Sequence, residues 1–157
     1  MAEVVNWIAL PMMVVAITGC SMGANETQSD RVTLEGRDPR ILVHHHSDFG
    51  MEALLTGRLV FNATNKCLAV QNTAEPPSRK TVILLWPQDT RPLIQNNKRG
   101  VQLGNGLILL EGAEVKIAGG YVDWNNSTPP GLKVPSECVG DAADSAIFEV
   151  NPFTPGG

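Results

Sequence analysis

Thr81-Val82-Ile83-Leu84-Leu85-Trp86 is a run of β-branched, aliphatic and aromatic residues that ends at Pro87. A short apolar run that does not alternate with polar residues is typical of a strand buried on both faces. Pro87 pushes Trp86 towards an extended backbone and cannot donate a hydrogen bond to a strand ladder. We therefore predict that this run is the central strand of a β-domain.

Segments on both sides of this run are predicted to form hairpins. Residues 58–61 and 67–71 are two short apolar runs joined by an Asn-rich turn. Residues 101–103 and 107–110 flank Gly104-Asn105-Gly106. Asn-Gly between such runs is the strongest short hairpin signal, because both residues tolerate positive φ. The sequence therefore predicts two hairpins, one before and one after the central strand.

The C-terminal part of the chain contains further predicted strands. Residues 115–117 alternate between apolar and polar, and we expect Gly119-Gly120 to end that strand. Residues 121–124 are a further short candidate, and residues 146–150 are the last one. These segments extend the β-domain almost to the end of the chain.

Prolines predict the loops. Residues 75–79 contain two prolines and residues 88–97 contain one, so we expect both segments to be loops. The whole pattern gives roughly six to eight short strands and no long helix. We predict an all-β protein, either a small barrel of the OB or SH3-like kind or a sandwich. The short hairpin connections favour the barrel.

Composition agrees with this class and limits the partners. A chain of 157 residues corresponds to one domain. The 11 prolines and 15 glycines, with only 5% aromatic residues, favour short strands and many turns. The formal net charge of −4 argues against a nucleic-acid partner, which a basic surface would attract.

The N-terminal segment carries a targeting pattern. Residues 4–19 are mostly apolar, too short to cross a bilayer comfortably and interrupted by Pro11. Ile17-Thr18-Gly19-Cys20 resembles the lipobox of bacterial lipoproteins: an aliphatic residue, two small residues and a cysteine. The resemblance implies that residues 1–19 are a signal peptide and that Cys20 carries a lipid such as palmitate. The protein would then be exported and anchored to the outer face of the bacterial cell membrane.

Two other interpretations of this segment remain open. An ordinary signal peptide would be cleaved near Ser21 or Ala24, where small residues also occur. A packed N-terminal helix would have to be buried on all faces. With the lipoprotein interpretation, we expect a flexible tether over residues 20–53 and the small all-β domain over residues 54–157.

The chain has three cysteines, and in an exported protein an odd one needs a separate role. Lipidation of Cys20 supplies that role and leaves Cys67 and Cys138 as a predicted disulfide. Two buried thiols in a reduced protein are the alternative. Because no Cys-x-x-Cys motif is present, we expect neither a zinc site nor thioredoxin-like chemistry.

His44, His45 and His46 are the only histidines, and they lie within the predicted tether. They are weak candidates for a metal site, because consecutive side chains in an extended segment point to alternate faces. We expect a solvated patch of the tether instead. On this interpretation, the β-domain contains no histidine that could act as a catalytic base.

No nucleophile or phosphate-binding motif is present, so we expect no cofactor and no enzymatic activity. Tyr121, Asp123, Trp124 and Asn126 are the candidate ligand-binding residues, because aromatic faces beside amide and carboxylate groups can stack on sugars. The alternative is that Trp124 lies in the core. A less favoured hypothesis is a hydrolase that uses close carboxylates, either Glu111 with Glu114 or Asp141 with Asp144.

The β-domain carries a second, less specific resemblance. The Gly-x-Leu, Cys-Leu and Trp-Pro pairs at Gly57-Leu59, Cys67-Leu68 and Trp86-Pro87 are similar to those of small exported actinobacterial proteins of uncharacterised function. This resemblance implies no activity. The sequence as a whole therefore predicts a lipid-anchored protein with a binding or structural role at the cell envelope. Its partner there would be a glycan or a protein, and a carbohydrate-binding module is the alternative.

Overall fold

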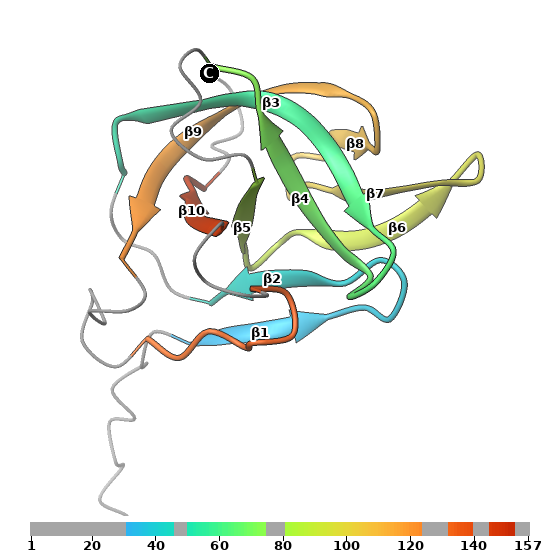
Figure 1. The fold of residues 1–157 in the computed structure, drawn as a ribbon, viewed down its shortest axis with the longest axis horizontal. Coiled ribbons are helices and arrows are strands. Elements are labelled where there is room, and N and C mark those ends of the chain that lie inside the picture. Colours follow the sequence, from blue (N-terminus) through green and yellow to red (C-terminus); the bar gives the residue numbers. More distant parts are fainter. Residues whose placement is uncertain (1–30, 46–49, 75–80, 124–131, 140–144, 153–157) are drawn as a thin grey trace, which may run out of the picture.

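The computed structural model describes residues 31–45, 50–74, 81–123, 132–139 and 145–152 (Figure 1). These residues contain ten strands and no helix. The strands are β1 (Val32–Glu35), β2 (Ile41–His44), β3 (Ala53–Asn62), β4 (Cys67–Asn72), β5 (Thr81–Pro87), β6 (Arg91–Gln95), β7 (Lys98–Gln102), β8 (Ile108–Leu110), β9 (Glu114–Val122) and β10 (Ser145–Val150).

Five of the strands close into a barrel. Around the barrel the order is β3-β4-β5-β10-β9, and β9 returns to β3. The pair β5–β10 is parallel and the other four pairs are antiparallel. If the five strands are numbered in chain order, their order around the barrel is 1-2-3-5-4-1, and strands 3 and 5 are parallel. This is the topology of an OB-type barrel. The predicted all-β barrel is confirmed, and the sandwich alternative is excluded.

β5 is the central strand, as its sequence predicts. Along one edge it pairs with β4 and then with β2, and along the other edge it pairs with β10. Val82, Leu84 and Trp86 point into the barrel core, and Ile83 and Leu85 belong to a second apolar cluster outside the barrel. All five side chains are buried, which explains why this run does not alternate with polar residues.

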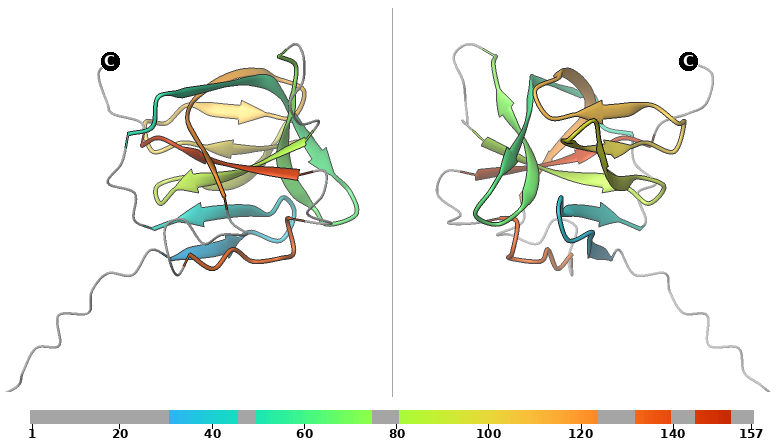
Figure 2. Two further views of the ribbon diagram at one scale, coloured as in Figure 1. Left: turned by 60° about the vertical axis from the view of Figure 1, so that its left-hand side comes forward. Right: turned by 90° about the vertical axis from the view of Figure 1, so that its right-hand side faces the viewer.

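A second layer covers part of the barrel from outside. It consists of β1, β2 and residues 132–139, which lie together on one side of the barrel (Figure 2). Leu132 and Val139 pack with Val32 of β1 and with Ile83 and Leu85 of β5. The Cys67–Cys138 disulfide joins this layer to the start of β4. The predicted pairing of these two cysteines is therefore present.

The prediction of a flexible tether over residues 20–53 is wrong for the part of this range that the structure describes. Residues 32–35 and 41–44 are the strands β1 and β2, and Ile41, Leu42 and Val43 are almost fully buried. Strands of four residues are too short to show a periodicity, and β2 is buried on both faces. The described β-domain thus begins near Val32 rather than at residue 54, and residues 20–30 lie outside the described part.

Two predictions about single segments were also wrong. The predicted loop at residues 88–97 contains β6, which tolerates Pro92 because β6 is the edge strand of the sheet β6-β7-β8. β9 continues through Gly119 and Gly120 and ends at Val122. A Cβ on Gly119 would overlap the carbonyl oxygen of Glu149 and lie 2.5 Å from the Phe148 ring, so the glycine allows close pairing with β10.

Both predicted hairpins are confirmed. Gly57–Asn62 of β3 pairs with Cys67–Asn72 of β4, and β7 and β8 are joined across the Asn-Gly turn. At that turn the Leu103 N–H donates to the Leu107 carbonyl over 2.8 Å, and Gly106 has a φ of 86°. The three-stranded sheet β6-β7-β8 contributes Val101, together with Leu103 of the turn, to the barrel core.

Candidate functional site

The predicted sugar-binding patch is described only in part. Tyr121, near the end of β9, is 47% exposed, and Asp123 directly after the strand is also exposed. Trp124 and Asn126 lie outside the described residues. The structure therefore places an aromatic ring and a carboxylate at the surface within three residues, and it leaves the other two predicted members untested.

The Tyr121 ring is held by the barrel core. Tyr121 lies opposite Phe148 in the β9–β10 ladder, and the two rings meet edge to face with centroids 5.1 Å apart. Phe148 is fully buried, whereas about half of Tyr121 remains accessible. Such a contact fixes the orientation of the exposed ring. A fixed aromatic surface is what stacking on a flat apolar ligand requires.

A histidine–glutamate pair that the sequence analysis missed lies inside the domain. His44 Nδ1 of β2 is 2.9 Å from Glu149 Oε1 of β10, and the side chains are only 4% and 6% exposed. His44 therefore belongs to the folded β-domain, and the expectation of a solvated patch without a histidine in the domain was wrong. No alternation in the sequence could have indicated this, because all four residues of β2 are buried.

The remaining histidines do not complete a metal site in the described part. His45 Nε2 is 2.7 Å from the Thr33 hydroxyl, and His46 lies outside the described residues. No group of three potential metal ligands occurs among the residues that are described.

The His44–Glu149 geometry has a chemical and a structural interpretation. A carboxylate that holds one imidazole nitrogen is the arrangement that orients a catalytic base. Catalysis also requires access for a substrate, and both side chains are almost completely buried. The pair therefore functions as a buried polar link between β2 and β10.

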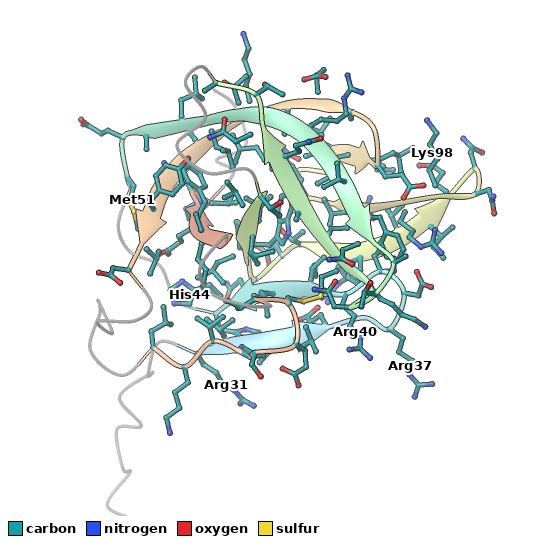
Figure 3. The ribbon with its side chains drawn as sticks, in the orientation of Figure 1. Arg31, Arg37, Arg40, His44, Met51 and Lys98 are labelled. Atoms are coloured by element: carbon teal, nitrogen blue, oxygen red, sulfur yellow. A yellow bond between two sulfur atoms is a disulfide. The ribbon has the colours of Figure 1, made fainter. Side chains whose placement is uncertain are left out.

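Met51, labelled in Figure 3, packs against Gly120, which lies opposite Glu149 in the β9–β10 ladder. The Asn151 side chain accepts a hydrogen bond from the Met51 N–H over 3.0 Å and donates one to the Met51 carbonyl over 2.8 Å. This double contact holds the Met51 side chain against Gly120, where a Cβ would overlap the Met51 sulfur. Gly120 is therefore required for this close contact.

The predicted carboxylate pairs gain no support from the described residues. Glu114 Oε1 accepts two hydrogen bonds from Arg58, over 2.9 and 2.7 Å, on the exposed outer face of β3 and β9. Its carboxylate is therefore held in a surface ion pair. Glu111 lies at the turn before β9 and is partly exposed, and Asp141 and Asp144 lie outside the described residues.

A second ion pair joins the β1–β2 turn to the small sheet. Arg99 Nε of β7 donates to Asp38 Oδ1 over 2.5 Å, and the guanidinium lies 4.0 Å from the centre of the Phe61 ring. The hydrogen bonds from Arg99 lower the pKa of Asp38, and the positive charges of Arg99 and Lys66 act in the same direction. The same hydrogen bonds raise the pKa of Arg99.

The outer face that OB-type barrels use for ligands is covered here. Such barrels bind oligonucleotides or oligosaccharides across their second and third strands, which correspond to β4 and β5. Ala69, Ile83 and Leu85 on that face are buried in the cluster formed with Leu132 and Val139. The disulfide fixes the covering segment, so this face is not available to a ligand in the described conformation.

The fold and these contacts define a small, disulfide-linked β-barrel protein with OB-type connectivity. No family model, curated protein or solved structure matches the chain. Among the described residues, no helix exists that could cross a membrane.

Proposed function

We propose that the protein is an exported lipoprotein whose barrel has a binding or structural role at the outer face of the bacterial cell membrane. The observation that carries the proposal is the Cys67–Cys138 disulfide. It uses two of the three cysteines and leaves Cys20, which directly follows Ile17-Thr18-Gly19. Disulfides persist in oxidising compartments, so the paired cysteines support export, and the remaining cysteine supports lipidation.

The geometry of the described domain is compatible with a short tether. The described chain begins at Arg31, 11 residues after Cys20. A fully extended segment of that length reaches roughly 36–40 Å, which is enough to clear lipid headgroups. The barrel would therefore stay close to the membrane.

A non-catalytic role fits the contacts best. The buried histidine of the described domain is inaccessible to a substrate, and Glu114 is held by Arg58. These groups stabilise the fold and offer no described arrangement for acid–base chemistry. The barrel is better suited to present a surface than to perform a reaction.

The anchor is tested by comparing the full-length chain with Cys20→Ala after expression in a bacterial host. We expect the wild-type protein to enter the detergent phase and to carry the added mass of acyl chains. Cys20→Ala should lack that mass and should leave the detergent phase if it is cleaved. Equal masses without acylation for both proteins would overturn the proposal. Retention of residues 1–19 in both would also do so.

Carbohydrate binding is a second candidate, and the half-exposed Tyr121 ring favours it. Stacking would depend on the ring and not on its hydroxyl, so Tyr121→Ala should abolish retention on an immobilised polysaccharide while Tyr121→Phe keeps it. Trp124→Ala should have the same effect as Tyr121→Ala if both rings contact the glycan. Retention that survives Tyr121→Ala and Trp124→Ala together would exclude this function for the patch.

A further inference from the structure

We propose that one side of the barrel binds anionic phospholipid headgroups, so that the tethered domain lies with this side on the bilayer. We call it the basic face, and its cations are Arg31, Arg37, Arg40, Lys66 and Lys133. The proposal deepens the proposed function, because it assumes that Cys20 holds the protein at a membrane. It adds the chemistry that the domain contacts there.

The basic face combines segments that are far apart in sequence. Arg31 precedes β1, and Arg37 and Arg40 lie in the turn between β1 and β2. The Arg40 N–H donates to the Lys66 carbonyl over 2.7 Å, which brings the β3–β4 turn to the same place. Lys133 lies in the segment that packs on β1 through Leu132. In Figure 3, Arg31, Arg37 and Arg40 project from the same side of the molecule.

The carboxylates near this face are largely neutralised by other cations. Asp38 is bonded to Arg99, and Glu35 lies 3.9 Å from Arg91. Within the described ranges, none of the five cations of the basic face forms an ion pair with a carboxylate. The carboxylate of Glu137 is the counter-charge in the covering segment 132–139. The face is therefore positively charged although the whole chain has a formal charge of −4.

The short distance in sequence between Cys20 and the start of the described domain favours a bilayer as the partner. The described domain begins at Arg31, which is itself part of the basic face, and Cys20 lies 11 residues upstream. A lipid on Cys20 would hold this side of the domain nearest to the headgroups. Basic residues gain attraction to anionic lipids only within about 8–10 Å of the surface at ordinary salt. The tether and the charge thus favour the same orientation.

The test uses the full-length chain with Cys20→Ala, so that no acyl chain contributes to binding. Sedimentation with vesicles compares phosphatidylcholine alone with phosphatidylcholine mixed with phosphatidylglycerol. Each lost cation near the surface should weaken binding roughly fivefold. We therefore expect Arg31→Gln with Arg37→Gln to lower the affinity for the anionic vesicles about 25-fold, and we expect high salt to remove the difference.

Lys98→Gln with Lys116→Gln is the matched control, because it removes the same charge from exposed positions on β7 and β9. The control should bind nearly as well as the Cys20→Ala parent. All these proteins contain residues 1–19, so any insertion of that apolar segment is common to them. Unchanged thermal unfolding of both double variants shows that the fold is retained.

Equal losses for the two double variants would overturn the proposal, because the location of the charge would not matter. Equal binding to neutral and anionic vesicles would do the same. Binding to heparin as tight as binding to the anionic vesicles would replace the bilayer with an anionic polysaccharide as partner. Lipidation is measured separately by the mass of the wild-type protein. Selective vesicle binding without acylation would therefore overturn the anchor and support the headgroup contact.

Discussion

Two side-chain pairs link residues that are distant in sequence, and they differ in their exposure to solvent. His44 and Glu149 are buried and join β2 to β10. Asp38 and Arg99 are about one-third exposed and join the β1–β2 turn to β7. A buried pair is costly to break because the remaining group keeps its desolvation penalty, whereas an exposed pair is screened by water. We therefore expect the two pairs to respond differently to mutation.

Loss of one partner of the buried pair should strongly destabilise the domain. We expect His44→Ala and Glu149→Gln each to lower the free energy of unfolding by about 3–5 kcal/mol. The double variant His44→Leu with Glu149→Leu should lose less than the sum of the single changes, because neither side chain is left buried without the other. Denaturant unfolding in a double-mutant cycle measures this coupling. Additive effects would show that the two groups do not stabilise each other.

The Asp38–Arg99 pair predicts an acid-dependent loss of stability. Because the pKa of Asp38 is lower in the folded protein than its ordinary value of 3.8, the pair stabilises the fold fully above that value. This contribution is lost as the pH falls through the lower folded pKa. In Asp38→Asn, that part of the acid dependence should be missing. Urea midpoints measured from neutral to acidic pH test this, with Glu114→Gln as the control for an exposed pair.

At the scale of single elements, strand β9 contains two glycines that allow neighbouring groups to approach its backbone closely. Gly119 and Gly120 interrupt the apolar alternation in the sequence, yet the strand passes through both. Gly119 meets the backbone and an aromatic ring of β10 on one side, and Gly120 meets Met51 on the other. Glycine within a strand can thus mark a close approach rather than an end.

Gly119→Ala should therefore be destabilising although alanine is a conservative change. The added methyl would collide with the Glu149 backbone and the Phe148 ring, and we expect a loss of about 1–3 kcal/mol from overpacking. Gly50→Ala is the matched control, since no atom lies within 4 Å of the position that its Cβ would take and its backbone needs no positive φ. Thermal unfolding compares the two. A loss in Gly50→Ala as large as in Gly119→Ala would contradict the steric explanation.

At the scale of the whole molecule, the disulfide fixes the outer layer on the barrel. Cys67 and Cys138 are separated by 71 residues, and the bridge holds the segment 132–139 over β4 and β5. In the chain-entropy account, a bridge over a loop of this length restricts the unfolded chain strongly. The bridge also keeps the outer apolar cluster out of water.

Removal of the bridge should lower stability and uncover the barrel face. We expect Cys67→Ala with Cys138→Ala to lose about 4 kcal/mol of unfolding free energy. Amide hydrogen exchange should increase first at Leu132 and Val139, because these residues lie beside the lost bridge. Addition of a reductant to the wild-type protein should have the same effect. An unchanged denaturation midpoint in both experiments would show that packing alone holds this layer.

The sequence by itself determined the features that depend on neighbouring residues. The run 81–86 predicts the central strand, Asn105-Gly106 predicts a hairpin, and the cysteine count predicts the pairing of Cys67 with Cys138. Periodicity and turn chemistry depend on a few neighbouring residues, and the number of cysteines is a property of the whole sequence. These features can therefore be recognised without coordinates. They were sufficient for the all-β class, but they left a barrel and a sandwich open, and the structure shows the barrel.

Only the tertiary structure decided which distant segments meet. β1 and β2 were missed because four-residue strands carry too little pattern, and their burial comes from pairing with β5 and packing under residues 132–139. The His44–Glu149 link joins residues 105 positions apart, and the basic face gathers cations from three regions of the chain. Such contacts depend on how the barrel closes. Closure is set by the packing of the complete core and not by any one segment.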